Sequence, residues 1–418
     1  MDRKKAIKLG IGFATGRKSF RKTLKSYVYN WKESGLTEDE NVSLNLFVAY
    51  DTTYRNAKRG DFVNLNPKID EDIDGKFFIS RESIERESEK LIEKGIIGSA
   101  ESAGIFAKGY AAQRNAAIYA AVKNGMDYLI FLDDDEYPLA VTRGMKSAVW
   151  SGQHVLESHI RNLEGADYTN GHHCGYISPI PYVEYDDTMT ERDFRSFIEA
   201  ISNDIVNWDK IRNVMEDGGV TYADKTILVE DEVPEINNSK FISGSNLGIN
   251  LTDPRRLLPF YNPPGARGED TFLGTCLHER KVVKVPCYTF HDGFASYNHL
   301  LEGVLPTKLK CLKADNPKIV ERFYQACIGW IRYKPLFLYI TQPDEYGERI
   351  ATIRRQLEEV LPKIAGYFDQ PKFLNILPEL NRFDRNVAKH YSDFTMARHA
   401  WSKIMDHLAE SAATRASV

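Results

Sequence analysis

One stretch in the first third of the chain couples a helix pattern, a strand pattern and three consecutive acidic residues. Residues 110–124 (YAAQRNAAIYAAVKN) are rich in alanine, and Gly125 follows at a position where glycine commonly ends a helix. Residues 128–132 (YLIFL) form an apolar run of strand length that leads directly into the aspartates at 133–135. This order predicts a helix followed by a buried strand with carboxylates at its carboxyl end, where α/β folds collect their ligands.

Strand and helix patterns alternate from the N-terminus to about residue 300. Residues 7–13 (IKLGIGF) predict a short buried strand, and residues 19–31 predict a helix behind Ser19. Residues 44–50 predict a second strand, which places Asp51 at the carboxyl edge of a parallel sheet. Further strands are expected at 166–176, 226–229, 241–250 and 282–290, and further helices at 80–94 and 191–215. The fold class predicted from this alternation is α/β.

The strand pattern fades after about residue 300. Three long segments with helical spacing follow, at 317–339, 346–367 and 384–412. We therefore expect two domains, an α/β domain over residues 1–300 and a mainly helical domain over residues 301–418.

Composition narrows the class of partners. The 418 residues carry a formal net charge of -4, and the pI is near 6.2, which gives no overall attraction for nucleic acid. The most apolar stretch, 323–340, is interrupted by Arg332, Lys334 and Pro335, and the N-terminus lacks the apolar core of a signal peptide. We expect no transmembrane segment, while peripheral membrane contact stays open.

The cysteines favour a reducing compartment. They are scattered, odd in number and without CxxC spacing, which predicts neither a disulfide framework nor a zinc knuckle. The expected location is the cytoplasm. The five are Cys174, Cys276, Cys287, Cys311 and Cys327.

Asp133, Asp134 and Asp135 predict a metal site. Carboxylates held this close repel one another, and a divalent cation relieves that repulsion. Oxygen ligands suit Mg²⁺ or Mn²⁺, and such an ion can neutralise a leaving diphosphate. A solvated loop and a calcium site are the alternatives that this pattern leaves open.

The run from Gly109 to Pro138 (GYAAQRNAAIYAAVKNGMDYLIFLDDDEYP) resembles the helix, strand and DxD segment of GT-A glycosyltransferases, particularly those similar to family 2. The resemblance implies a Rossmann-like nucleotide-diphospho-sugar transferase domain. It implies that Asp133 or Asp134 contacts the ribose or the metal, that Asp135 coordinates the metal, and that Arg114 lies near the nucleotide diphosphate.

The same resemblance extends to the first two strands. It implies that Ala14 and Thr15 hold the nucleotide and that Asp51 approaches the base. The chain departs from the family here, because Asp51-Thr52-Thr53 stands where an Asp-Gly-Ser sequence is usual.

Later segments continue the resemblance. Ser245 and Asn246 belong to a glycine-rich segment that looks like the strand lining the donor and acceptor pocket. Glu269 and Asp270 resemble the Glu-Asp motif of the acceptor-side helix, where Asp270 is the candidate general base. Capping of a helix N-terminus is the alternative for this acidic pair. His291, at the end of an apolar strand, matches a third metal ligand of the family, and a structural histidine is the alternative.

His172, His173 and Cys174 form another conspicuous group. Adjacent residues on a strand point to opposite faces, so the three are not expected to share one metal ion. We expect them to line a pocket or lie in the core.

The resemblance thus implies a hexosyltransferase-type enzyme that moves a sugar from a nucleotide-diphosphate donor, most simply a UDP- or GDP-sugar, to a carbohydrate or other hydroxyl acceptor. Mn²⁺ or Mg²⁺ would be its cofactor. The alternatives are a sugar-phosphate nucleotidyltransferase and a non-catalytic carbohydrate-binding or scaffold protein of the same fold. The C-terminal helices would complete the acceptor pocket, touch a membrane or pair subunits in a homo-oligomer.

Overall fold

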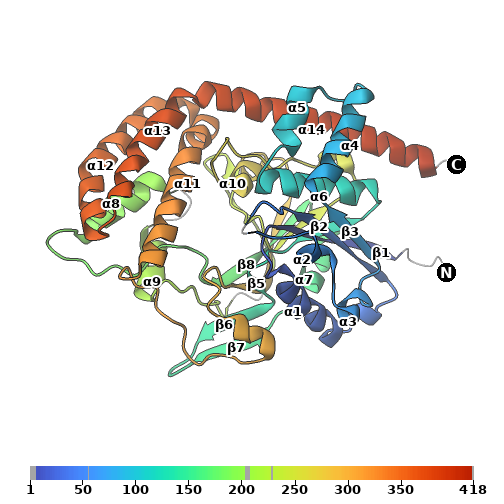
Figure 1. Cartoon of the computed structure of the whole chain (residues 1–418), viewed down its shortest axis with the longest axis horizontal. Helices are drawn as coiled ribbons and strands as arrows, with labels where there is room; N and C mark the ends of the chain where they lie inside the picture. Colours follow the sequence, from blue (N-terminus) through green and yellow to red (C-terminus); the bar gives the residue numbers. More distant parts are fainter. Residues whose placement is uncertain (1–5, 55, 203–207, 227–228, 417–418) are drawn as a thin grey trace.

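The computed structural model describes residues 6–54, 56–202, 208–226 and 229–416, which form an α/β structure around a nine-stranded mixed sheet (Figure 1). The strands follow the order β3-β2-β1-β4-β12-β8-β13-β5, and β9 pairs with β13. The sheet strands are β1 Ile7–Thr15, β2 Val42–Tyr50, β3 Gly75–Ile79, β4 Tyr128–Phe131, β5 Glu136–Tyr137, β8 Tyr168–Gly175, β9 Asp231–Glu232, β12 Leu247–Asn250 and β13 Val282–His291. Two small hairpins pair β6 Leu139–Arg143 with β7 Ala148–Gly152, and β10 Glu235–Ile236 with β11 Ser239–Lys240.

Strand direction decides which loops meet. The strands β1 to β4 are parallel, β12 runs antiparallel between β4 and β8, and β13 is parallel to β8. The carboxyl ends of β1, β2, β4, β8 and β13 therefore lie at the edge where β12 begins. Because the strand order turns back at β1, with β2 on one side and β4 on the other, this is the edge at which open α/β sheets bind ligands.

The first strand shows how its sequence fits the sheet. Leu9, Ile11 and Phe13 point into the hydrophobic cluster beneath α1 and α7. Gly12 lies on the opposite face, where a Cβ atom would come within 2.8 Å of the Phe131 ring. The alternation of large residues and glycines in IKLGIGF thus lets β1 lie closely against β4.

Helices cover both faces of the sheet. Those before residue 300 are α1 Phe20–Glu33, α2 Gly60–Val63, α3 Pro67–Asp70, α4 Arg81–Glu93, α5 Ser99–Phe106, α6 Tyr110–Lys123, α7 Val155–Leu163, α8 Glu191–Ile201, α9 Trp208–Glu216 and α10 Glu269–Gly274. Those after it are α11 Pro317–Thr341, α12 Tyr346–Tyr367, α13 Ile376–Arg385 and α14 Val387–Ala416. Short 3₁₀ turns occur at Leu36–Glu38, Pro254–Arg256, Asn298–Glu302, Pro343–Glu345 and Pro371–Asn375.

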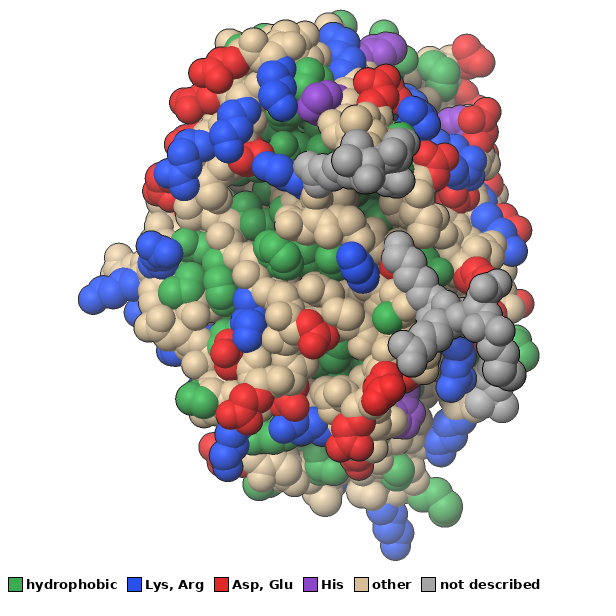
Figure 2. Space-filling model, turned by 90° about the vertical axis from the view of Figure 1, so that its right-hand side faces the viewer, with side chains coloured by type: hydrophobic (Ala, Val, Ile, Leu, Met, Phe, Trp, Pro, Cys, Tyr) green, Lys and Arg blue, Asp and Glu red, His purple; other side chains and the backbone are tan. Residues whose placement is uncertain are grey.

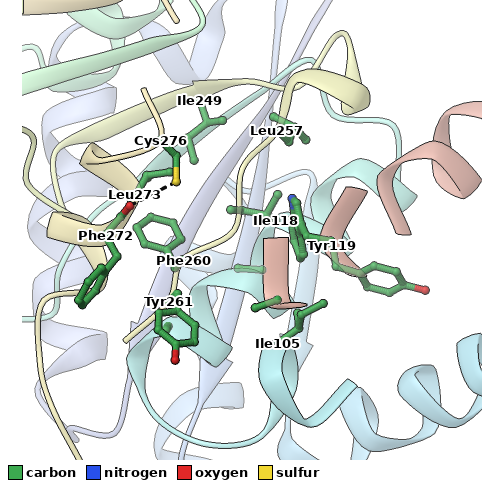
Figure 3. Close-up of a cluster of buried hydrophobic side chains, with 14 of the residues drawn as sticks. Ile105, Ile118, Tyr119, Ile249, Leu257, Phe260, Tyr261, Phe272, Leu273 and Cys276 are labelled. Carbon is green, nitrogen blue, oxygen red and sulfur yellow. Dashed lines mark hydrogen bonds between the residues drawn. The ribbon is translucent and has the colours of Figure 1, made fainter. Parts of the chain in front are cut away.

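The alanine-rich helix α6 packs into the largest hydrophobic cluster, part of which is drawn in Figure 3. Ile118 and Tyr119 of this helix share the cluster with Ile105 of α5 and with Phe260 and Phe272 from the segment around α10. Small alanine side chains let α6 approach the sheet, so the composition that favours the helix also sets its distance from β1 and β4.

Helices on both sides of residue 300 share hydrophobic clusters. The helix α14 crosses the molecule to lie beside α5, and Phe394 and Trp401 join the cluster under α6 (Figure 1). A second cluster packs α8 and α9 against α11, α12 and α13. The division at residue 300 stays a prediction about folding units.

Most expected elements are present, and the differences lie in the middle of the chain. The expected helix at 191–215 is two helices, α8 and α9, between which residues 203–207 lie outside the described part. Residues 227–228 of the strand expected at 226–229 also lie outside it. Only Leu247–Asn250 of the strand expected at 241–250 is extended into the sheet, because Asn246 has a positive φ of 48° that turns the chain before β12.

Two features of the described residues concern polarity, namely the hydropathy of the helices and the distribution of charged side chains on one face of the molecule. Within the described ranges, none of the helices combines the length and apolar character required to cross a bilayer. On the face drawn in Figure 2, lysine and arginine side chains alternate with aspartate and glutamate side chains.

Candidate functional site

The predicted site residues come from several strands that end at one edge of the sheet. Thr15 ends β1, Asp133, Asp134 and Asp135 follow β4, and His291 ends β13. The parallel pairing of β1 with β4, and of β13 with β8 beyond the intervening β12, brings these ends to the same edge. The loop that enters β12 adds Ser245 and Asn246 from the opposite chain direction.

Asp134 is held by the loop after β1. The Thr15 hydroxyl donates a hydrogen bond to Oδ2 of Asp134, and Nη1 of Arg17 lies 3.0 Å from its Oδ1. The hydroxyl of Thr23 donates to the backbone carbonyl of Asp134 at 2.8 Å. Asp134 is 6% exposed, and burial raises its pKa to about 7 although the Arg17 guanidinium opposes that rise. The side chain is therefore mainly a partner of Thr15 and Arg17.

Asp135 faces two basic groups. Nη1 of Arg17 donates to its Oδ2, and Nε2 of His291 lies 3.5 Å from the same oxygen. Burial favours the protonated acid, but His291 and Arg17 outweigh it and hold the pKa of Asp135 well below its usual range. Asp135 therefore stays ionised near neutral pH.

The orientation of His291 is fixed by its second ring nitrogen. Nδ1 lies 2.5 Å from the backbone carbonyl oxygen of Tyr176, and because a carbonyl accepts only, Nδ1 carries the proton and donates. Nε2 is thereby directed at Asp135. Burial favours neutral imidazole, yet Asp135, Glu136 and the Tyr176 carbonyl prevail and raise the pKa of His291 to about 9.

Arg114 links Asp133 to the segment around α10. Its side chain is 4% exposed, with Nη2 3.0 Å from Oδ1 of Asp133 and Nε 3.7 Å from Oε1 of Glu269. Nη1 donates to the carbonyl of Gly244, and the guanidinium lies 5.1 Å from the ring centroid of Phe131. Arg114 is thus a buried counter-ion that joins three segments of the site.

Asp270 and Glu269 begin α10. Oδ2 of Asp270 accepts from the backbone N–H of Gly244 at 3.1 Å, and its Oδ1 accepts from the N–H of Thr271 at 2.9 Å. Burial raises the pKa of both Glu269 and Asp270, while the nearby Arg114 lowers it. The hydrogen bonds at the start of α10 fit a capping role, and the raised pKa of Asp270 fits a general base. Both interpretations of the acidic pair therefore remain open.

Ser245 and Asn246 support the site from inside the sheet. The Asn246 side chain is fully buried, with Nδ2 donating to the His172 carbonyl at 3.0 Å and Oδ1 2.8 Å from Nε2 of His159. The Ser245 hydroxyl donates to Oε1 of Glu136 at 2.7 Å. Asn246 thus uses its polar atoms to join β12 to β8 and α7.

Asp51 lies in a separate part of the same edge. It lines a cavity of about 470 Å³ where α4 and α6 begin, together with several basic side chains. Its Oδ1 accepts hydrogen bonds from the backbone and hydroxyl of Thr53, at 2.8 and 2.7 Å. Ala14 lies in the neighbouring β1, buried beside Ala49 of β2. The basic residues lining this cavity are Lys58, Arg59, Arg81 and Lys108.

The side chains at 172–174 divide between the hydrophobic core and the surroundings of Glu136. Cys174 is fully buried in a hydrophobic cluster, and the His172 ring stacks on Tyr288 with centroids 5.1 Å apart. His173 turns the other way, where Nε2 lies 3.2 Å from the Ser245 hydroxyl and 3.5 Å from Glu136. All five cysteines of the chain are free.

The three predicted metal ligands do not converge. Asp135 and His291 lie together, whereas the Asp133 carboxylate pairs with Arg114. Within the described residues there is no group of three or more histidine, cysteine or acidic side chains arranged to hold a metal ion. Asp135 still fits Mg²⁺ or Mn²⁺, because such ions are commonly held by one or two carboxylates together with substrate phosphates and water. Nε2 of His291 can join as a second ligand once it has released its proton.

Sequence reasoning missed Arg17, Glu136 and Arg322. Arg17 lies two residues after a strand end, where a basic side chain reaches the same edge as the aspartates. Glu136 follows the aspartates directly, and it is buried between the hydroxyls of Ser245 and Thr289, each donating at 2.7 Å. The local sequence does not predict that Arg322 belongs to the site, because it is the packing of α11 that brings this residue to the sheet edge.

The comparisons with known proteins leave the site to be interpreted on its geometry. Neither the scan against protein-family models nor the search of curated proteins found a match.

Proposed function

We propose that this chain is a glycosyltransferase of the GT-A fold that transfers a sugar from a nucleotide-diphosphate sugar to an acceptor hydroxyl. The observation that carries the proposal is the Asp135–His291 pair beside Arg17, where β1, β4 and β13 end. The pair lies at the carboxyl edge of the sheet, beside the point where the strand order reverses, which is where open α/β sheets bind nucleotides. The resemblance of residues 109–138 to the DxD segment gives the reaction class.

Metal dependence is part of the proposal. Asp135 and His291 would hold Mn²⁺ or Mg²⁺, with donor phosphates completing the set. When bound, the ion supplies positive charge that stabilises a departing diphosphate. The guanidinium of Arg17 is a permanent cation paired with Asp135, so Arg17 would have to leave Asp135 when the metal ion binds there.

The nucleoside would occupy the cavity of about 470 Å³ that Asp51 lines, which opens where α4 and α6 begin. Arg114 would act as a positioning residue, because it fixes Asp133 and the Gly244 carbonyl on one guanidinium. Asp270, whose pKa is raised by burial, is the candidate base for an acceptor hydroxyl if the reaction inverts the anomeric centre. The free cysteines fit a cytoplasmic enzyme.

The test is the thermal stability of the purified protein with uridine, guanosine, cytidine and adenosine diphosphates, each with Mn²⁺ or with chelator. Binding to the native state alone stabilises it by about 2.7 kcal/mol at a ligand concentration 100-fold above Kd. We expect one nucleotide to raise the melting temperature only with Mn²⁺, and Asp135→Ala to abolish the rise. Asp187→Ala, which removes an exposed aspartate far along the chain, is the matched control. If no nucleotide has an effect on the wild type, the proposal fails and a non-catalytic carbohydrate-binding or scaffold role takes its place.

A further inference from the structure

The helix α11 brings Arg322 to the edge of the candidate site. Its Nη1 donates to the carbonyl of Gly293, and its guanidinium lies 4.5 Å from the centroid of the Phe294 ring. A Cβ atom on Gly293 would lie 2.7 Å from Nη2 of Arg322 and 3.3 Å from Nε2 of His291. Arg322 and His291 therefore flank the same glycine, and His291 is the neighbour of Asp135.

Arg267 approaches from the segment before α10. Its side chain lies over α11, where Cδ would be 3.0 Å from a Cβ atom on Gly329. Gly329 follows Arg322 by seven residues, about two helical turns, so both arginines lie along one face of α11. Burial lowers the pKa of Arg322, Asp135 opposes that effect, and Arg17 and Arg267 are near enough to reinforce it.

Among the described residues, Arg267 and Arg322 lack the ion pairs that the other arginines of the site make. Arg17 pairs with Asp134 and Asp135, and Arg114 pairs with Asp133 and Glu269. Within the described part of the chain, neither Arg267 nor Arg322 lies within ion-pair distance of an acidic side chain. Counting the described residues alone, Arg322 uses one of its five N–H donors on protein, at Gly293. A half-buried guanidinium that has no ion-pair partner among the described residues, and has N–H donors to spare, is suited to an anion.

We propose that Arg322 and Arg267 bind a phosphate group of the substrate, so that residues after 300 supply one wall of the pocket. A guanidinium matches phosphate oxygens through paired N–H donors, which a lysine cannot reproduce. The binding of a phosphate group at these arginines does not depend on the proposed function, whereas the molecule that carries the phosphate does. That source is either the diphosphate of the donor or a phosphate carried by the acceptor.

The direct test is calorimetric titration of the full chain with inorganic pyrophosphate and inorganic phosphate. The wild type should bind pyrophosphate, and Arg322→Gln should weaken binding by about 10- to 100-fold, the range for one charge-assisted hydrogen-bonding group. Arg267→Gln tests the same site through an exposed side chain, and its loss should leave the fold intact. Arg398→Gln is the matched control, because Arg398 also stacks on a phenylalanine and has no acidic partner among the described residues.

Absence of pyrophosphate binding in the wild type overturns the inference, and so does binding unchanged in both variants. Titration with nucleoside mono- and diphosphates then identifies the source. If the donor supplies the phosphate, Arg322→Gln weakens diphosphate binding and spares monophosphate binding. If the acceptor supplies it, nucleotide binding is unchanged and phosphate still binds alongside saturating nucleotide.

This result is separable from failure of the proposed function. Arginine-dependent pyrophosphate binding without any nucleotide binding would keep the phosphate site and reject the nucleotide-sugar donor. Metal-dependent nucleotide binding in the wild type, together with pyrophosphate and phosphate binding that is unchanged in both arginine variants, would keep the proposed function and reject the phosphate site.

Discussion

Replacing Arg114 by methionine should be among the most destabilising single changes in the chain. Methionine keeps the apolar stem between the rings of Phe131 and Phe260, whose centroids lie 5.1 and 5.5 Å from the guanidinium. The substitution removes the cation that faces Asp133 and Glu269 and leaves the Gly244 carbonyl without its donor.

The magnitude follows from the burial of these partners. Removing one partner of a buried ion pair costs about 3–5 kcal/mol, because an uncompensated charge remains. Asp133 is 32% exposed in its side chain and can rehydrate, whereas Glu269 is 18% exposed and cannot do so fully. We therefore expect a loss of about 3 kcal/mol in the free energy of unfolding at pH 8.

The loss should shrink in acid. The pKa of Glu269 is already raised in the folded state, and loss of Arg114 raises it further. Because the pKa of Glu269 is higher in the folded than in the unfolded state, the folded state binds the proton more tightly. Glu269 therefore contributes favourably to the free energy of unfolding at low pH, and this contribution is lost as the pH rises. The assay is urea unfolding at pH 5 and pH 8, followed by tryptophan fluorescence, with Arg398→Met as a control expected within about 0.5 kcal/mol of wild type. A loss below about 1 kcal/mol at pH 8, or one independent of pH, would refute the counter-ion role of Arg114.

Three further predictions concern neighbouring parts of the structure. His159 is fully buried, and burial lowers its pKa from 6.5 to about 4. The stability that it contributes above pH 6.5 should therefore be lost as the pH falls to 4, by about 3 kcal/mol. In urea unfolding, His159→Gln should make the free energy of unfolding depend less on pH over this range. Gly268→Ala should lower Tm more than Gly109→Ala, because both glycines have φ near 97–98° but only Gly268 would press a Cβ atom against the Tyr333 ring, at 2.9 Å. Asp135→Asn should destabilise the protein by about 1–3 kcal/mol, since it removes the carboxylate that Arg17 and His291 share. Asp134→Asn should cost less than about 1 kcal/mol at pH 6, because burial raises the pKa of Asp134 to about 7. Equal losses in thermal denaturation would contradict the conclusion that Asp135 is ionised and Asp134 is mainly protonated at this pH.

Much of the fold was predictable because local patterns and tertiary structure agree. The alternation in IKLGIGF and the apolar run YLIFL mark β1 and β4, and the alanine-rich segment marks α6. The long C-terminal helices were likewise expected from spacing alone. Between residues 229 and 250 the short strands depend on pairing rather than on local pattern, and the positive φ of Asn246 explains why only Leu247–Asn250 of the expected strand forms β12.

The candidate site was predictable where chemistry follows a strand. Asp135 and His291 do meet, because β4 and β13 end at one edge of the sheet. The sequence could not reveal that Asp133 turns to Arg114 or that Arg17 contacts both Asp134 and Asp135, since those contacts depend on loop geometry.

The most direct test of the proposed function is a crystal structure of the chain with Mn²⁺ and the nucleoside diphosphate selected by thermal stability. Anomalous scattering should place one Mn²⁺ at about 2.0–2.3 Å from a carboxylate oxygen of Asp135 and from Nε2 of His291. Diphosphate oxygens should complete its coordination, and Arg17 should have moved off Asp135. Mn²⁺ bound elsewhere, or nucleotide bound with the Arg17–Asp135 pair intact and no ion beside it, would contradict the proposed function.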